Sequence, residues 1–460
     1  MPEKGSRERL ESRLGFILIS AGCAIGIGNV WKFPYLAGQN GGGIFVLIYL
    51  FFLAILGIPV MTMEFSMGRA SRKSPIYLYQ RIAPEGSKWN LHGIVCMAGN
   101  YILMMFYTTV AGWMIKYFVS MARGDFEGLD KDGVAGLFGG MLSSPSIQVG
   151  YMAVVVIVGF FINSLGLQNG LEKVSKWMMS SLLIIMVILA LNSILMKGSA
   201  EGLSFYLLPN VAKISEIGWP KVIVSAMNQA FFTLSIGIGS MAIFGSYIGN
   251  ERSLMGESVH IAVLDTFVAI VSGLIIFPAC FTYGVQPDSG PSLIFITLPN
   301  IFNNMPLGRV WGSLFFVFMS FAAFSTVLAV FENIVSCGMD LTKKSRKQVS
   351  LFNLIVIIVL SLPCVFGFSA WAFDWLKPFG GTILDLEDFL VSNIILPLGS
   401  LVYLLFCVSR YGWGWDNYLK ECNKGEGLKM KNWMRFYLTF ILPIIVLFIF
   451  VFGIYDKFFK

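Results

Sequence analysis

Two stretches that contain the same tripeptide decide the fold predicted for this chain. The first is Gly22-Cys-Ala-Ile-Gly-Ile-Gly-Asn29, and the second is Thr233-Leu-Ser-Ile-Gly-Ile-Gly-Ser240. Each lies within a long apolar segment, and a glycine inside a helix costs up to about 1 kcal/mol relative to alanine. Two glycines at a spacing of two, beside Asn or Ser, therefore predict a helix that is interrupted in its middle.

The apolar segments around these stretches are long enough to cross a membrane. Of the 460 residues, 56% are hydrophobic and 13% are charged, whereas a soluble domain has about 25% charged residues. A helix needs about 20 apolar residues to span the hydrocarbon core of a bilayer. Eleven segments at or near this length are 14–38, 42–68, 90–122, 147–163, 171–196, 218–248, 256–284, 306–339, 348–367, 382–409 and 433–456. No polar linker divides them, so the sequence predicts a single all-α polytopic membrane domain over residues 1–460.

The basic residues predict how this domain lies in the membrane. If the N-terminus is cytoplasmic, the inner loops contain most of the 33 Lys and Arg residues, and the outer loop at 123–132 is acidic. Lys and Arg are enriched in cytoplasmic loops. We therefore expect the N-terminus inside and, with an odd number of helices, the C-terminus outside. The first apolar segment is too long for a cleaved signal peptide.

The two glycine stretches lie five apolar segments apart, in the first and sixth segments. Matched interrupted helices in two halves of a chain indicate a transporter with its site between inverted repeats. We expect repeat one at about 10–200, repeat two at about 215–410, and an appended helix at about 433–456. Alternatively, the glycines only allow close helix packing; their matched positions favour the interruption.

An interrupted helix supplies groups that bind ions and carboxylates. Backbone N–H and C=O groups freed at bilayer depth need partners, and freed carbonyls suit a hard cation such as sodium. Asn29 and Thr233 lie at the two predicted breaks, and the eighth segment contains adjacent hydroxyls at Ser325 and Thr326. These hydroxyls could instead bond to the backbone of their own helix.

Other classes of protein receive little support from the sequence. No basic face interleaved with aromatic residues indicates nucleic-acid binding, and seven scattered Cys with only two His, His92 and His260, do not predict a zinc site. An enzyme would need a nucleophile–base or metal constellation, and neither histidine lies in such a motif. No helix has the polar stripe of a channel. A non-transporting sensor on the same fold stays open.

The interrupted stretches belong to longer motifs that resemble the neurotransmitter:sodium symporter family. The motifs are Ala21-Gly-Cys-Ala-Ile-Gly-Ile-Gly-Asn-Val-Trp-Lys-Phe-Pro-Tyr35, Asn40-Gly-Gly-Gly43, Gly57-Ile-Pro59, Glu64-Phe-Ser-Met-Gly-Arg69, Gln229-Ala-Phe-Phe-Thr-Leu-Ser235 and Phe321-Ala-Ala-Phe-Ser-Thr326. They occur in order between residue 7 and about residue 400. The resemblance implies inverted five-plus-five helix repeats and an activity similar to the bacterial transporters for leucine, tryptophan and other hydrophobic amino acids. Most relatives have twelve helices, and eleven resembles a bacterial subgroup.

The resemblance implies two sodium sites. Site one would use Ala24, Asn29, Thr233, Asp265 and the carboxylate of the substrate, and site two would use Gly22, Ile25, Ala322, Ser325 and Thr326. A substrate that completes the ion's ligand shell would raise the affinity for sodium, and sodium would raise the affinity for substrate. No organic cofactor is expected.

The resemblance also implies a substrate pocket and two gates. The pocket would be formed by Ala24, Gly26, Ile27, Gly28, Leu103, Tyr107, Phe232, Thr233, Ser235, Ile238, Thr326 and Val330. Lys32 and Asp388 would close the outer side, where many relatives have Arg in place of Lys32. Arg7, Asp340 and Tyr247 would close the cytoplasmic side. Tyr107 could also be an ordinary packed tyrosine, and Arg7 could simply orient the chain.

The expected function is sodium-coupled import of neutral hydrophobic amino acids, aliphatic or aromatic, across a bacterial inner membrane. Monoamine carriers of the family have an aspartate where this chain has Gly26. Chloride-dependent members have a neutral asparagine where this chain has Asp265 and a serine where it has Ala269. Chloride independence is therefore expected, unless Asp265 lies at a helix end in cytoplasmic water. The alternative substrate is another small solute that carries a carboxylate.

Overall fold

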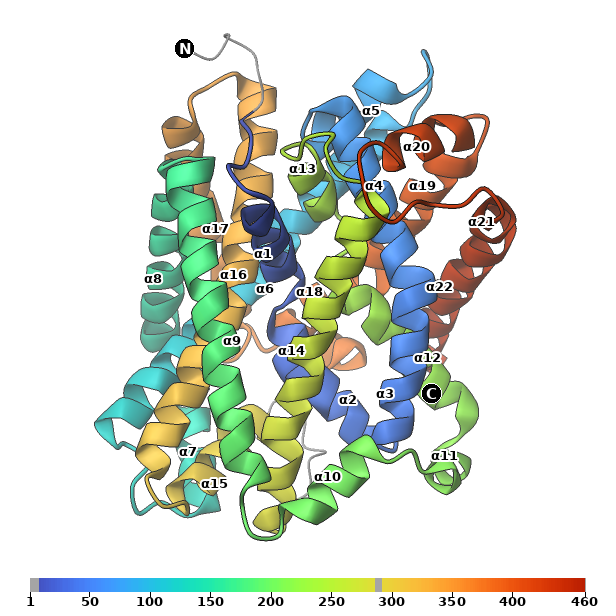
Figure 1. The fold of residues 1–460 in the computed structure, drawn as a ribbon. Coiled ribbons are helices and arrows are strands. Elements are labelled where there is room, and N and C mark those ends of the chain that lie inside the picture. Colours follow the sequence, from blue (N-terminus) through green and yellow to red (C-terminus); the bar gives the residue numbers. More distant parts are fainter. Residues whose placement is uncertain (1–7, 286–291, 460) are drawn as a thin grey trace.

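The computed structural model describes residues 8–285 and 292–459, and Figure 1 shows that they form a bundle of helices. Within these ranges the chain contains no β-strand. In the first half the helices are α1 (Arg13–Ala24), α2 (Phe33–Gln39), α3 (Gly43–Phe52), α4 (Ile58–Ser71), α5 (Pro75–Ile82), α6 (Asn90–Arg123), α7 (Lys131–Leu142), α8 (Pro145–Ser164), α9 (Lys173–Ile194), α10 (Ser199–Leu207) and α11 (Val211–Ile217). In the second half they are α12 (Trp219–Thr233), α13 (Ser240–Gly245), α14 (Leu254–Thr282), α15 (Leu298–Asn303), α16 (Gly308–Thr342), α17 (Arg346–Phe366), α18 (Ile383–Phe389), α19 (Leu396–Val408), α20 (Trp415–Cys422), α21 (Met434–Phe436) and α22 (Leu442–Phe459).

Short π-helical turns join several of these helices into longer rods. The joining turns are η1 (Gly28–Lys32), η2 (Leu53–Gly57), η3 (Leu167–Glu172), η4 (Leu293–Thr297), η6 (Leu390–Ile395) and η7 (Tyr437–Ile441). The 3₁₀ helix η5 (Asp374–Phe379) stands alone between α17 and α18. Among the described residues, nine rods are long and apolar enough to cross a membrane. The continuous rods correspond to nine of the eleven predicted segments. The two that are missing are the first and the sixth, which the glycine pattern predicts to be interrupted.

The first of these segments is broken between α1 and η1. Its two halves, Arg13–Ala24 and Gly28–Gln39, form one candidate span with a bend of 56°. Ile25 leaves the helix in an extended conformation. Gly26 and Gly28 allow neighbouring side chains to approach the unwound backbone, because a Cβ atom at these positions would collide with Tyr107 and Phe232. The predicted break is confirmed.

The sixth segment is broken between α12 and α13. Ser235, Gly237 and Gly239 have φ angles of +51°, +104° and +78°, which no helix accommodates and which favour glycine. A Cβ atom at Gly237 would also collide with the backbone of Leu396 in α19. The α12–α13 pair lies where the sixth segment was predicted, but it is not a candidate span by length and composition. The described residues therefore contain up to ten candidate spans, against eleven predicted. Neither half is long enough to cross a membrane alone, because α12 has 15 residues and α13 has six.

The broken helices lie inside the bundle. In Figure 1, α1 lies among α9, α14 and α16. These long helices extend to the end of the bundle that carries α7, α10 and α15. α12 packs on α3, and α13 packs on α4 and α16. The last helix, α22, lies at the edge of the bundle against α19. α1 also contacts α13, and η1 contacts α12, so the two breaks lie close together in the interior.

Candidate functional site

A buried carboxylate connects the two broken helices. Asp265 is fully buried within α14, away from the ends of that helix. Its Oδ1 accepts a hydrogen bond from Asn29 Nδ2 at 2.8 Å, and its Oδ2 accepts one from Thr233 Oγ1 at 3.0 Å. Tyr49 of α3 donates to the same Oδ2 at 3.4 Å. Asp265, Asn29 and Thr233 therefore form one oxygen-rich cluster, and the sequence did not predict that Tyr49 joins it.

Asn29 of this cluster and two other polar side chains, Tyr107 and Gln229, bond to the unwound backbone of the first helix. The Gly26 N–H donates to Asn29 Oδ1 at 3.3 Å. The Ile27 N–H donates to the Tyr107 hydroxyl at 2.9 Å, and Gln229 Nε2 donates to the Gly28 carbonyl at 3.2 Å. Tyr107 therefore contacts the break directly, at the point where its hydroxyl could also bind a carboxylate.

The paired hydroxyls of α16 face the end of α1. Ser325 Oγ lies 3.3 Å from the Ile25 carbonyl, and Thr326 Oγ1 lies 3.3 Å from the Gly22 carbonyl. Ser325 also donates to the Ala322 carbonyl of its own helix at 2.9 Å. All five predicted oxygen donors of the second sodium site thus lie together. Oxygen atoms of this kind are the ligands that hard cations prefer.

A small internal cavity of about 20 Å³ lies between the two breaks. Its walls include nine predicted substrate residues, namely Ala24, Gly26, Gly28, Leu103, Tyr107, Phe232, Ser235, Ile238 and Thr326. Val391 and Leu396 also line it, and the sequence missed both because apolar residues in a membrane helix carry no distinguishing signal. Val330 is fully buried but is not among the lining residues. No side chain that lines the cavity carries a charge.

A larger cavity of about 240 Å³ lies next to the internal one. Gly28, Tyr107 and Phe232 line both cavities, so these residues separate them, and Ile27 lines the larger one. Lys32 and Asp388 also line the larger cavity, with Nζ and Oδ2 4.0 Å apart. Lys32 Nζ lies 3.9 Å above the ring of Phe232. Since the Lys32 and Asp388 side chains are about one-third exposed, this ion pair is weak.

Two of the three residues predicted for the opposite gate, Asp340 and Tyr247, lie within the described part of the chain. Asp340 accepts hydrogen bonds from the backbone N–H and the hydroxyl of Ser74, at 3.0 and 2.6 Å. Arg7 lies outside the described residues, so its pairing with Asp340 stays a prediction. Tyr247 donates to Glu332 Oε1 at 2.6 Å.

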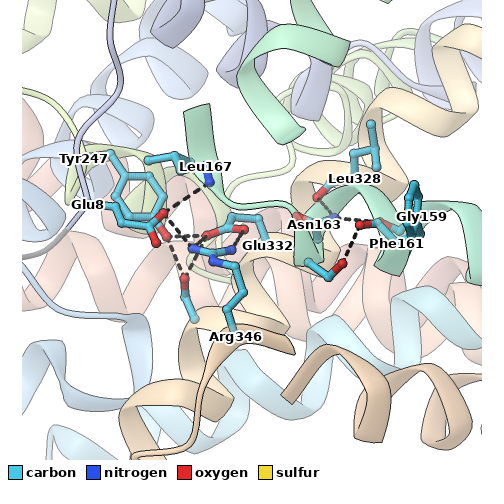
Figure 2. A network of polar contacts seen from close by, with 11 residues as sticks. Glu8, Gly159, Phe161, Asn163, Leu167, Tyr247, Leu328, Glu332 and Arg346 are labelled. Carbon is cyan, nitrogen blue, oxygen red and sulfur yellow. Dashed lines mark hydrogen bonds and ion pairs between the residues drawn. The ribbon is translucent and has the colours of Figure 1, made fainter. Parts of the chain in front are cut away.

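Figure 2 shows that Tyr247 belongs to a charged network centred on Glu332. Glu332 is fully buried and pairs with Arg346, with Nη1 and Oε2 2.5 Å apart. Glu8 contacts the same guanidinium at 3.1 Å. The sequence did not predict this network, because its charged members come from the N-terminal segment, α16 and α17.

The motifs and geometry agree with comparisons to known proteins. The family model described as "Sodium:neurotransmitter symporter family" matches residues 7–126 and 139–458. The chain belongs to this family. Members are sodium-dependent membrane transporters and not enzymes, so the chain is a sodium-dependent symporter.

Individual members of the sodium:neurotransmitter symporter family match almost the full length of the chain. YhdH of Bacillus subtilis, described as an uncharacterised sodium-dependent transporter, is 34% identical over 96% of each chain. The sodium- and chloride-dependent taurine transporter of Rattus norvegicus is 24% identical over 97% of this chain and 78% of its own. The crystal structure of MhsT in complex with L-phenylalanine is 34% identical, with a TM-score of 0.86 over 97% of this chain and 99% of MhsT. The predicted fold class is thereby confirmed.

The Glu332–Arg346 pair generates a prediction about stability. Glu332→Gln removes a fully buried charge from a 10% exposed guanidinium, and breaking such a pair costs about 3–5 kcal/mol. We expect a clear fall in the thermal unfolding temperature of the purified protein. The control is Asp374→Asn, which breaks an exposed pair with Lys377 of similar length, 2.7 Å, and should leave that temperature unchanged. Equal effects of the two variants would contradict the assignment.

Proposed function

We propose that this symporter imports neutral hydrophobic amino acids, aliphatic or aromatic, together with sodium by alternating access. The observation that carries the proposal is the internal cavity, which has uncharged walls and lies between two broken helices beside the Asp265 cluster. Exposed N–H groups of an interrupted helix suit a substrate carboxylate. The solved complex of MhsT with L-phenylalanine supports a substrate of this class.

Sodium site one is proposed at the Asp265 cluster. Its protein ligands would be the Ala24 carbonyl with side-chain oxygens of Asn29, Thr233 and Asp265, and the substrate carboxylate would complete the shell. The support is the direct contact of Asp265 with both Asn29 and Thr233. An ionisable residue at this depth is costly and marks a functional site by default.

Sodium site two is proposed between α1 and α16. The carbonyls of Gly22, Ile25 and Ala322 would act with the hydroxyls of Ser325 and Thr326. The support is that both hydroxyls reach across to carbonyls of the other helix. A cation there would hold the end of α1 against α16.

The substrate would lie with its carboxylate at the N–H groups of Ile27 and Gly28 and at the Tyr107 hydroxyl. An amino acid is favoured over a monoamine, because monoamine carriers of the family have an aspartate at the position of Gly26. In this chain Tyr107 and Thr326 leave no room for a side chain at that position. Leu103, Phe232, Ser235 and Ile238, which line the internal cavity, would surround the side chain of the substrate. A non-transporting sensor, or a carrier of another small carboxylate, is the alternative.

The proposed gates lie on either side of this site. Lys32, Asp388, Tyr107 and Phe232 would close the outer side, and Arg7, Asp340 and Tyr247 the cytoplasmic side. This arrangement implies that the N-terminus is cytoplasmic and that the C-terminus is outside, in the inner membrane of a bacterium. The two repeats would cover about 10–200 and 215–410, and the bilayer and the amino acid would be the partners.

A substrate screen tests the proposed function. We expect sodium to increase the uptake of leucine, phenylalanine or tryptophan into proteoliposomes. Glutamate and lysine should not be transported, because burying an unpaired charge in the cavity costs several kcal/mol. Dopamine and serotonin should not be transported either, because they have no carboxylate to complete sodium site one. Sodium-driven uptake of glutamate or lysine, with all hydrophobic amino acids inactive, would contradict the proposed pocket. Sodium-dependent binding without uptake would favour the sensor.

The second sodium site predicts the effect of removing its hydroxyls. Ser325→Ala with Thr326→Ala should lower sodium affinity by about tenfold or more, since a polar contact to a charge contributes about 1.5–3 kcal/mol. The control is Ser320→Ala in the same helix. Ser320 lines an apolar groove with Trp177, Phe321 and their neighbours, and its buried hydroxyl forms no hydrogen bond with the described residues. Sodium titrations of uptake and of thermal stability measure the effect. Wild-type sodium affinity in the double variant would mean that the hydroxyls only bond to backbone.

The Asp265 carboxylate predicts that transport does not require chloride. Asp265 would supply the negative charge near sodium site one that chloride supplies in dependent relatives, and the position of their anion-binding serine is the fully buried Ala269. Replacing chloride by gluconate should leave sodium-driven uptake unchanged. Asp265→Asn should abolish uptake or make it respond to chloride. Strong stimulation of the unmodified protein by chloride would overturn this prediction.

A further inference from the structure

The short helix α18 carries acidic side chains on two of its faces. Leu384, Asp385 and Asp388 line the 240 Å³ cavity. Glu387 lies in the same helical turn but is buried, with 4% of its surface exposed. α18 packs against α6 and α17 within the bundle, so Glu387 is held in the protein interior next to a residue of the outer ion pair.

The Glu387 carboxyl lacks the partners that a buried charge requires. Both of its oxygens are buried, and no described protein group forms a regular hydrogen bond with either one. The hydroxyl of Thr109 on α6 is also buried without such a bond. The Cys364 thiol of α17 lies between these groups and interacts with both. These three side chains, Glu387, Thr109 and Cys364, form a polar cluster that the proposed transport site does not use.

Other charged groups of the surrounding elements are engaged elsewhere. On α18, Asp385 caps its own helix through Thr382, and Asp388 pairs with Lys32. On the neighbouring turn η5, the exposed residues Asp374 and Lys377 pair with each other.

The Lys and Arg residues of the remaining elements that pack on α18 are paired elsewhere or exposed. Lys116 of α6 pairs with Asp125, Arg346 of α17 pairs with Glu332, and Arg123 and Lys347 are exposed. The turn η6 contains no ionisable residue, and Tyr107 of α6 faces the two cavities. Of all these groups, the Cys364 thiol is the one that interacts with Glu387.

We propose that Glu387 is a proton-binding site that exchanges H⁺ with external water as α18 moves during transport. An ionised carboxylate without a counter-charge is strongly disfavoured in such a setting. The thiol is a poor ligand for a hard metal cation, so the chemistry favours a proton. In the packed arrangement the neutral acid carries the proton, and on exposure to water the carboxylate releases it.

The position of Glu387 couples this proton to the outer gate. This coupling rests on the proposed function, because it assumes that α18 moves when the outer cavity opens and closes. Asp388 and Glu387 are adjacent in one turn, so a displacement of α18 that separates Lys32 from Asp388 also changes the burial of Glu387. External pH would then shift the balance between the packed and displaced arrangements of α18.

The first test detects the proton without measuring transport. At neutral pH, infrared spectra of the purified protein in lipid should contain the C=O stretching band of a protonated carboxylic acid. Glu387→Gln should remove one such band, whereas Asp374→Asn, which alters an exposed acid, should not. If the band is unchanged in Glu387→Gln while the protein retains its thermal stability, the proposal is wrong. This outcome does not depend on the substrate or on activity.

The second test measures sodium-driven uptake at varied external pH with the internal pH held constant. The uptake rates of the unmodified protein and of Asp374→Asn should depend on external pH in the same way. Because one group titrates, these rates should change by no more than about tenfold per pH unit. Glu387→Gln, which mimics the neutral acid, should lose that dependence and retain uptake. An unaltered pH profile in Glu387→Gln would overturn the link to the gate, whereas absence of uptake in the unmodified protein would overturn the proposed function instead.

Discussion

The unwound backbone of the first and sixth membrane helices must find hydrogen-bond partners inside the bundle, because the hydrocarbon around it offers none. Buried polar side chains meet this requirement. Tyr107 accepts from the Ile27 N–H, and Gln229 donates to the Gly28 carbonyl. In the sixth helix, Glu64 accepts from the Gly237 N–H, and Asn100 Nδ2 donates to the Ile238 carbonyl at 2.9 Å. Each partner comes from another helix, so the breaks fix the packing of the whole bundle.

The same requirement concentrates oxygen atoms at one depth. Asn29 lies just after the first break, and Thr233 lies just before the second. Asp265 accepts hydrogen bonds from both side chains, at 2.8 and 3.0 Å. A chain that buries a carboxylate here gains a site that favours a cation. The cavity beside it has walls without charge, which suits a substrate with a hydrophobic side chain. The buried carboxylate and the uncharged cavity thus lie beside the same interruption.

The sequence predicted the breaks because glycine and its neighbours carry a strong local signal. Gly237 and Gly239 adopt positive φ angles, and the repeated tripeptide placed both interruptions in the correct segments. Polar candidates such as Asn29 and Ser325 could also be recognised, since they stand out in apolar surroundings.

Contacts between distant helices could not be predicted in this way. Val391 and Leu396 line the internal cavity but look like any other apolar residue, and Val330 does not line it although its helix was correctly chosen. The Glu332–Arg346 pair depends on how α16 and α17 pack, and hydrophobic periodicity does not encode that packing. Sequence patterns therefore located the interrupted helices, whereas the residues that line the cavity between them became apparent only from the three-dimensional packing.

In the proposed mechanism, substrate and sodium complete each other's binding site at the broken helices. Calorimetric titration of sodium with and without a saturating hydrophobic amino acid, and of the amino acid with and without sodium, measures this coupling directly. We predict that each ligand raises the affinity for the other by the same factor, about 5- to 150-fold for typical coupling. Sodium affinity that does not change when the amino acid is bound would contradict a shared site.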